Sequence, residues 1–438
     1  MKKIIMGVLA AGVACAVFAT DARVETMGRM DNFFRDETSI HKNAANMGLY
    51  DKIMYGSYGF VDQSTGFDRI SPKLPYFGGM LSFGQTEGSL QKFAVGATFN
   101  RVDSALNYVA HNIDQLGLRY DRKRYQKVSG GDLSISGTQR SGNEISYLGS
   151  SSNSGTPPFD PSHQGNEIDL VGKIDLMFAY TLGNGTTVGL GGYLAFMDSS
   201  KTEKDGMENR FVRANVGVNT PIGDGVDLEV SVAVSALTLR GADLNNYVSV
   251  ADNDIGTYID FRMLADVPSI NAVFVPHIGA NIIQYYGGEE SILDFNAGLG
   301  FNLNIDRGFF WTGFEGLFKK YSFAALEEVG NDWVYGNKDI IGGKVGFGIE
   351  RNVLTDWFVI RVGGGKLLAK ESLAGGKRGS KWIENSDDDH VSLGMGINVE
   401  DRLKVDFTVS KNIPYTFTNL FSGEDPYIAT RVSAVFAF

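Results

Sequence analysis

The stretch Val226–Ser235, VDLEVSVAVS, alternates two kinds of residue without a break. Every second residue is Val or Leu, and the residues between them are Asp, Glu, Ser or Ala. Successive side chains of a β-strand point to opposite faces, so the pattern predicts a strand with one apolar and one polar face. The same period of two recurs at 259–263, 295–303, 345–349, 391–399 and 404–410. The chain is therefore predicted to be all-β.

Alternation alone fits two kinds of protein: a soluble sandwich or barrel with its apolar faces inside, or a transmembrane barrel with its apolar faces on lipid. Three features favour the membrane. The predicted strands reach about ten residues, as a tilted strand crossing a bilayer must. Aromatic residues gather at strand ends, where a bilayer interface would lie: Tyr76, Phe77, Tyr285, Tyr286, Trp357 and Phe358. Short connections also alternate with longer ones, near 102–166, 198–209, 241–254, 323–338, 371–389 and 412–425. The predicted fold is a transmembrane antiparallel β-barrel of 14–16 strands, spanning residues 51–438.

The composition excludes several classes of protein. Aromatic residues make up 12% of the chain, glycines number 55, and the net charge is −11. An acidic chain is unsuited to nucleic acid, so no nucleic-acid partner is expected. The lone cysteine, Cys15, excludes a disulfide scaffold and a zinc site made of cysteines.

Residues 1–19 have the pattern of a secretory signal peptide. Lys2 and Lys3 precede an apolar run from Ile4 to Phe18, and cleavage is predicted after Ala19. A lipoprotein signal with Cys15 as the lipidated residue is the alternative. An exported, aromatic-rich and glycine-rich acidic chain is predicted to reside in the outer membrane, where outer-membrane lipid and lipopolysaccharide would surround it.

The chain ends in a strand-like segment, Tyr427–Phe438, with Phe436 and Phe438 on one face. This end is similar to the C-terminal strand that outer-membrane barrels present to the barrel assembly machinery. Phe436 and Phe438 are therefore predicted to be an assembly signal. An ordinary final strand of a soluble domain is the alternative.

Residues 20–50 are polar and do not alternate. They contain Asp36, followed by Asn43-Ala44-Ala45-Asn46 just before the first predicted strand. This segment resembles the hatch of FadL-type outer-membrane transporters of long-chain fatty acids and other hydrophobic compounds, with Ala44 in place of the family motif's Pro. The resemblance implies a barrel of fourteen strands with an N-terminal plug, and Asp36, Asn43, Ala44, Ala45 and Asn46 as the hatch motif. A polar turn ahead of a strand is the alternative.

Six glycines give a separate reason to expect a plug. The alternation places all of them on the polar, inward face: Gly298, Gly300, Gly346, Gly348, Gly394 and Gly396. A wall without side chains lets another segment approach the sheet closely. Glycine also permits strand curvature, which is the alternative explanation.

The long external connection 102–166 holds a candidate surface for ligands. Leu106, Val109, Ile113 and Leu116 recur at helical spacing, with Asp103 or Ser104 as a cap, and the cations Arg122 and Arg124 follow. These residues are predicted to collect hydrophobic ligands, with the cations meeting a carboxylate or lipopolysaccharide phosphates. A helix that only narrows the barrel mouth is the alternative.

Motifs for catalysis or metal binding are missing from the sequence. The five histidines lack metal-ligand spacing, and the sequence has no HExxH, G-x-S-x-G or P-loop. No cofactor, metal or enzymatic activity is expected. Three functions remain: FadL-like passive transport of hydrophobic small molecules, a surface scaffold or adhesin, and a general porin for polar solutes.

Overall fold

The computed structural model describes residues 21–59, 75–84, 91–106, 138–141, 144–147, 172–196, 208–243, 246–285, 290–329, 332–353, 357–374, 380–383, 389–400, 402–410, 412–422, 428 and 431–438. The predicted signal peptide, with Cys15, and most of the connection 102–166 lie outside these residues. No helix of the described part is long and apolar enough to span a membrane.

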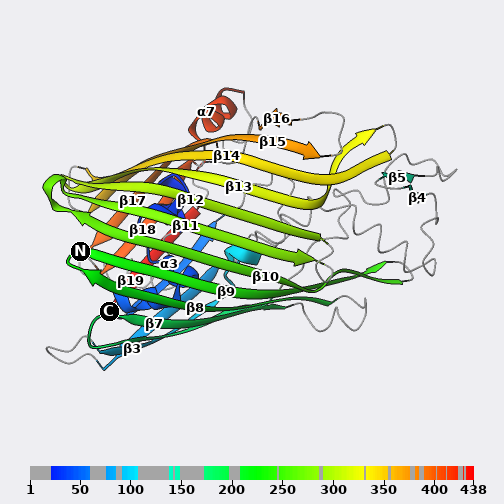
Figure 1. The fold of residues 1–438 in the computed structure, drawn as a ribbon. Helices are drawn as coiled ribbons and strands as arrows, with labels where there is room; N and C mark the ends of the chain where they lie inside the picture. Colours follow the sequence, from blue (N-terminus) through cyan, green and yellow to red (C-terminus); the bar gives the residue numbers. More distant parts are fainter. Residues whose placement is uncertain are drawn as a thin grey trace.

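Sixteen of the described strands form one closed ring of antiparallel neighbours (Figure 1). The ring closes where β1 pairs with β19, Ile53 opposite Ala437. The prediction of 14–16 strands is confirmed. The strands are β1 (Ile53–Gly59), β2 (Tyr76–Phe83), β3 (Lys92–Phe99), β6 (Gly172–Thr181), β7 (Thr187–Phe196), β8 (Glu208–Gly223), β9 (Val226–Asp243), β10 (Asn246–Val267), β11 (Ala272–Tyr285), β12 (Glu290–Ile305), β13 (Gly308–Val329), β14 (Asp332–Asn352), β15 (Phe358–Ala374), β17 (His390–Val399), β18 (Leu403–Ser410) and β19 (Arg431–Ala437).

Three short described strands lie outside this ring. Strand β4 (Thr138–Ser141) pairs with β5 (Glu144–Tyr147), and β5 also pairs with the far end of β14. Strand β16 (Ser380–Trp382) pairs with β15 beyond the part that pairs with β17.

The outward face of the ring is apolar. On β6, Leu176 and Phe178 are 51% and 48% exposed, whereas Asp175 and Met177 are 5% and 2% exposed. The same alternation appears on β7, where Leu190 is exposed and Tyr193 is buried. A soluble barrel would bury its apolar face instead. An apolar exterior with a polar interior is the arrangement that a bilayer requires.

The short turns gather at one end of the ring, on the left in Figure 1. Between β6 and β7, the N–H of Leu182 donates to Thr186 O at 2.7 Å, and Gly185 takes a φ of 87°. Gly225, between β8 and β9, likewise has a φ of 70°. Glycine adopts such values without strain. The predicted short turns Gly183–Gly185 and Pro221–Gly225 are confirmed in position.

Two predicted loops are wrong. Residues 241–254 and 323–338 are mostly strand, because β9 continues to Asp243 opposite Asn246 of β10, and β13 continues to Val329 opposite Asp332 of β14. These extensions are too polar to meet lipid, and hydrogen bonds between the strands hold them together instead. Strands β10 and β13 are 22 residues long, about twice what a bilayer crossing needs.

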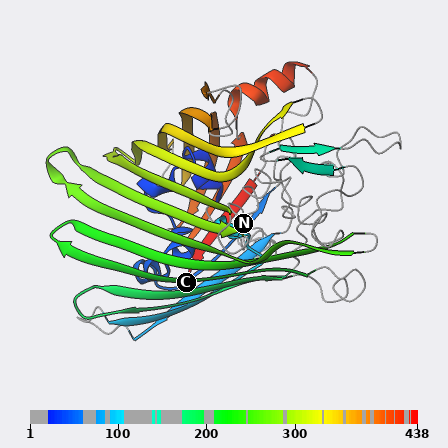
Figure 2. The ribbon, with the colours of Figure 1, turned by 45° about the vertical axis from the view of Figure 1, so that its right-hand side comes forward.

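Four short helices precede β1: α2 (Asp21–Thr26), η1 (Asp31–Phe33), α3 (Ser39–Lys42) and η2 (Ala44–Leu49). They are drawn in blue within the ring in Figures 1 and 2. Helix η5 (Pro268–Ile270) makes the turn between β10 and β11. Helix α7 (Ile413–Ser422), which falls in the predicted loop 412–425, lies outside the ring and contacts β17.

Candidate functional site

Residues 21–50, called the N-terminal segment below, follow the inner wall strand by strand, in the reverse of chain order. The segment starts at the last strand, where the N–H of Ala22 donates to Ser433 Oγ of β19 at 3.0 Å. Thr408 of β18 then donates to the Glu25 carboxylate at 3.1 Å, and Ser392 of β17 donates to Glu25 O at 3.0 Å. The first turn of the segment is thus tied to three consecutive strands.

The path continues across the middle of the ring. Trp311 Nε1 of β13 donates to Met27 O at 2.9 Å, and Asn302 Nδ2 of β12 donates to Phe33 O at 2.8 Å. Arg262 of β10 donates to Phe34 O at 3.0 Å. These bonds hold the segment by its backbone carbonyls.

The segment ends beside the first strands. Arg35 donates to Glu229 of β9 at 3.1 Å, and Asn43 Nδ2 donates to Val218 O of β8 at 3.3 Å. A Cβ on Gly48 would collide with Thr187 of β7. The described segment therefore contacts nearly the whole inner circumference, close to the short turns.

Glycines of the wall make room for this path. A Cβ built on any of nine inward glycines would collide with the segment or come within 2.8 Å of it. Five of these glycines were predicted as points of close approach: Gly298 and Gly300 against Phe33, Gly346 against Met30, Gly348 against Met27 and Gly394 against Thr26. The other four were missed: Gly189 against Ala45, Gly217 against Asn43, Gly313 against Phe33 and Gly363 against Gly28. The predicted Gly396 instead faces Arg361 and Asp406 of the wall.

The residues of the predicted hatch motif lie on the segment and anchor it. Asp36 accepts hydrogen bonds from Arg23 at 2.8 Å and from the N–H of Thr38 at 3.1 Å. Asn43 Oδ1 accepts from the N–H of Ala45 at 3.0 Å and so caps η2.

The rest of the motif faces the wall. Ala44 and Ala45 are fully buried, and Asn46 donates to Glu229 of β9 at 3.1 Å while accepting from Asn219 of β8 at 3.0 Å. The motif thus joins the segment to β7, β8 and β9. Its role in transport stays a prediction.

Two apolar clusters seal the contact between segment and wall. In the first, Met27, Met30, Phe33 and Phe34 pack against Leu264, Val275 and the fully buried Trp311. The rings of Phe34 and Trp311 lie 5.6 Å apart. In the second, Ile40, Ala44 and Met47 pack against Tyr55, Tyr76 and Met80. Burial of each such side chain contributes about 1.5–3 kcal/mol.

Ion pairs add to the apolar seal. Arg35 pairs with Asp227 at 2.8 Å and with Glu229 at 3.1 Å, and Glu229 also pairs with Arg262 of the wall. Arg23 pairs with Glu350 at 2.8 Å, and the Glu350 carboxylate also pairs with Arg361 of the wall. Glu229 and Glu350 therefore each have one cationic partner on the segment and another within the wall.

A buried charge cluster lies where the connection 102–166 begins. Arg101 forms ion pairs with Asp103 at 2.8 Å and Asp175 at 2.7 Å, and Arg213 also reaches Asp103. Asp103 Oδ1 accepts from the N–H of Ala105 at 2.8 Å, a bond of the kind that a capping residue makes. The rest of the predicted helix lies outside the described residues.

The predicted ligand-collecting residues can be placed only in part. Leu106 is fully buried. Val109, Ile113, Leu116, Arg122 and Arg124 lie outside the described residues. Their function stays a prediction.

Further from the short turns, the inward face of the wall carries apolar side chains. Phe211 of β8 and Leu237 of β9 are opposite each other and buried. Ile292 of β12 is opposite both Ile283 of β11 and Tyr321 of β13, and all three are buried. This apolar lining was not predicted from the sequence, because the inward face of the strands was expected to be polar along its whole length.

We expect His41, on α3, to make the contact between the N-terminal segment and the wall sensitive to pH. Burial, together with the cations of Arg101 and Arg213, holds the pKa of His41 well below its ordinary value. His41 therefore binds a proton more readily once the segment has left the wall. The contact between segment and wall is weakened as the pH falls below about 6.5, the ordinary pKa of histidine.

We expect ion conductance through the reconstituted protein to rise between pH 7 and pH 5. The rise should be up to about tenfold per pH unit below 6.5, since one proton is taken up on release. In the variant His41→Gln the rise should be much smaller. A rise of the same size in His41→Gln would assign the pH response to the carboxylates instead.

The described residues contain no group of three or more His, Cys, Asp or Glu side chains that could hold a metal ion. The expectations of no metal, no cofactor and no enzymatic activity stay predictions. At the C-terminus, the rings of Phe436 and Phe438 stack at 6.1 Å. Their role as an assembly signal also stays a prediction.

No model of a known protein family matches the chain, and no curated protein matches it. Among solved structures, the toluene transporter TodX of Pseudomonas putida is similar at 9% identity and a TM-score of 0.35, over 96% of this chain and 98% of that one. The deltaS2 mutant of the monoaromatic hydrocarbon channel TodX is similar at 10% identity and a TM-score of 0.39, over 97% of this chain and 100% of that one. OmpT, an outer membrane protein of Vibrio cholerae, is similar at 9% identity and a TM-score of 0.37, over 89% of this chain and 97% of that one. These values are too low to show membership of a family.

Proposed function

We propose that the chain is a divergent FadL-type barrel of the outer membrane that lets small hydrophobic molecules pass, with the N-terminal segment as its plug. The observation that carries the proposal is the nearly continuous contact of residues 22–48 with the inner wall, from Ser433 of β19 round to Thr187 of β7. Sixteen strands would otherwise enclose an aqueous channel. A segment that fills this channel implies that passage is selective or gated.

The plug argues against a general porin. A porin needs an open aqueous path, whereas Phe33, Phe34 and Trp311 meet in a buried apolar cluster across the described wall. Such a seal excludes water and hydrated ions together.

The cargo is proposed to be hydrophobic because of the wall beyond the plug. Ile283, Ile292 and Tyr321 form a buried apolar cluster on the inward side of three adjacent strands. The ammonium groups of Lys319 and Lys338 lie 5.2 and 4.6 Å from the centre of the Tyr321 ring. Pockets for small molecules are typically apolar with a few polar groups that orient the ligand.

Transport assays on vesicles containing the full protein test this proposal. We expect a hydrophobic fluorescent probe, such as N-phenylnaphthylamine, to enter faster than a sugar of similar size. Changing Ile283→Gln together with Ile292→Gln should slow the probe by roughly tenfold or more, because two apolar contacts are lost. Sugar entry, which does not use this surface, should stay the same and serves as the control. Equal rates for probe and sugar in the parent protein would contradict the proposal.

A scaffold function has one observation in its favour. Strands β10 and β13 continue well beyond the length that a bilayer crossing needs, paired with β9 and β14, so these two hairpins project from the membrane. If the parent protein passes neither probe nor sugar, while a surface partner depends on these extensions, the scaffold function is preferred.

A further inference from the structure

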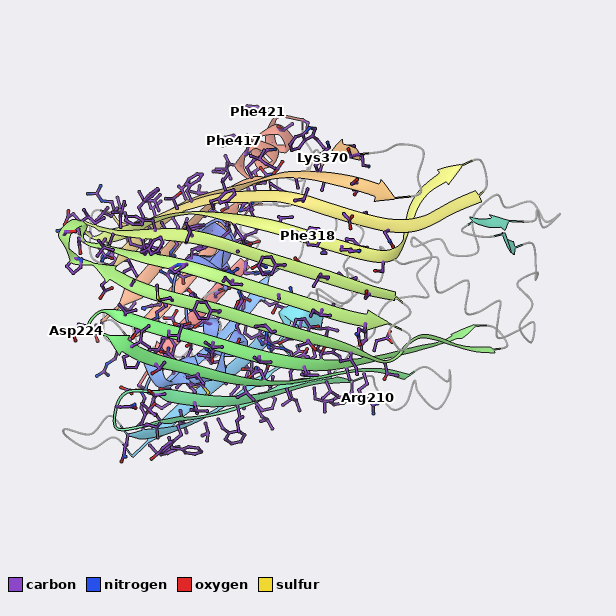
Figure 3. The ribbon with its side chains drawn as sticks, viewed as in Figure 1. Arg210, Asp224, Phe318, Lys370, Phe417 and Phe421 are labelled. Atoms are coloured by element: carbon purple, nitrogen blue, oxygen red, sulfur yellow. The ribbon has the colours of Figure 1, made fainter. Side chains whose placement is uncertain are left out.

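Helix α7 presents an apolar face that the described protein does not cover. Its sequence, IPYTFTNLFS, has no charged residue. Phe417, Leu420 and Phe421 are three and four residues apart, so they share one face, and they are 56%, 55% and 85% exposed. Figure 3 shows Phe417 and Phe421 on the helix outside the sheet. Such a helix is suited to lie in a membrane interface.

The neighbouring strand places α7 at the outer surface of the bilayer. Outward positions on β15 alternate from Phe358, at the short-turn end, to Lys366 and Lys370. A tilted strand crosses the hydrocarbon in about 9–11 residues. Lys366, eight residues beyond Phe358, therefore lies near the outer boundary. Trp382 of β16, opposite Lys370 and 64% exposed, is the kind of residue found at that level.

A groove of about 600 Å³ opens beneath the start of α7. Val345 and Phe347 of β14 form its apolar wall, and Asn412 and Pro414 cover it. Gly364 forms its floor, where a Cβ would come within 2.8 Å of His390 O. The groove is therefore deep because this position has no side chain.

Charged side chains line one side of the groove. Lys366 and Asp389 line it and form an ion pair, and Asp389 Oδ1 also accepts from the N–H of Leu367 at 2.9 Å. Lys370, also exposed and outward, is two outward positions further along β15, near α7 in Figure 3. The two lysines outnumber Asp389, so a net positive charge at headgroup level lies above an apolar groove, which matches a lipid whose headgroup is anionic.

We propose that this groove holds an acyl chain of an anionic, phosphate-bearing lipid of the outer leaflet, with Lys366 and Lys370 meeting its phosphate. The apolar face of α7 then lies among the neighbouring chains. The site lies on the outside of the barrel, so it does not depend on whether the lumen transports anything.

Quenching of Trp382 fluorescence by brominated lipids tests this site. The full protein is placed in phosphatidylcholine vesicles that contain a small fraction of brominated phosphatidylglycerol or, separately, brominated phosphatidylcholine. The fluorescence of Trp382 is obtained by subtracting the fluorescence of the matching Trp382→Phe variant from that of each protein. In the parent, we expect stronger quenching by the anionic lipid.

Charge reversal at Lys366 and Lys370 should lower this preference about fivefold for each lysine. Val345→Phe, which fills the groove from the lipid side, should lower it while both lysines remain. Arg210→Glu is the matched control, because Arg210 is an exposed outward residue on β8, on the other side of the barrel. Heat-modified mobility in gels reports that each barrel is folded.

Three results would overturn the proposal. The parent could show no preference for the anionic lipid, or Arg210→Glu could lower the preference as much as reversal of the two lysines. The third is a dimer in native mass spectra that dissociates on reversal of Lys366 and Lys370, since it would assign this face to a second copy of the chain.

Discussion

Removal of residues 22–48 is expected to leave a barrel that inserts into membranes and conducts ions about tenfold or more above the parent. The N-terminal segment contacts most of the inner circumference near the short turns. A ring of sixteen strands without this segment resembles an open porin. The measurement is single-channel conductance in planar bilayers, on protein that shows heat-modified mobility.

The wall is expected to survive this deletion because its charges are paired within it. Glu229 keeps Arg262 when Arg35 is lost, and Glu350 keeps Arg361 when Arg23 is lost. The apolar outward face, which holds the barrel in the bilayer, is untouched. An unchanged conductance in a folded barrel would mean that the segment does not close the lumen.

The change Gly189→Val is expected to open the channel almost as far as the deletion does. A Cβ on Gly189 would collide with the backbone of Ala44 and Ala45, which a side chain cannot avoid by rotating. The segment must therefore leave the wall at β7. We expect conductance to rise several-fold, with the barrel still folded.

Gly192→Val provides a matched control on the same strand. Gly192 faces outward, and a Cβ there would meet no atom within 4 Å. Both variants add the same side chain to β7 and have the same effect on strand propensity. If Gly192→Val raises conductance as much as Gly189→Val does, the rise comes from a weakened strand rather than from a displaced segment.

The barrel could be predicted because its signal is local and repeated. A period of two, as in Val226–Ser235, specifies both a strand and its two faces, and the short turns mark one end. The extensions of β9 and β13 could not be predicted this way. Residues 323–329 of β13 do not alternate apolar and polar residues, so their sequence carries no strand signal of this kind. Helix α7 was missed because Pro414 and the β-branched threonines of its sequence favour a loop by local propensity.

The site could be predicted in part, through the glycines. Gly298, Gly300, Gly346, Gly348 and Gly394 are visible in the sequence because they break an otherwise polar inward face. The partner of each glycine could not be predicted, since Phe33 and Gly300 are far apart in the chain and meet only once the ring has closed. Trp311 gave no signal either, because on an inward position it resembles any interfacial aromatic.

Placement of the N-terminal segment can be measured directly with a disulfide. The mature chain is predicted to lack cysteine, since Cys15 lies in the signal peptide, so two introduced cysteines can pair only with each other. A Cβ built on Gly346 lies 3.4 Å from Met30 Cγ, the position that a cysteine sulfur at residue 30 would take. A disulfide brings each sulfur to about this distance from the opposite Cβ. In Met30→Cys with Gly346→Cys, oxidised in intact outer membranes, we expect a cross-link between residues 30 and 346 in most molecules, identified by mass spectrometry of the digested protein. Two free thiols that react with a membrane-impermeant maleimide in the folded barrel would contradict it.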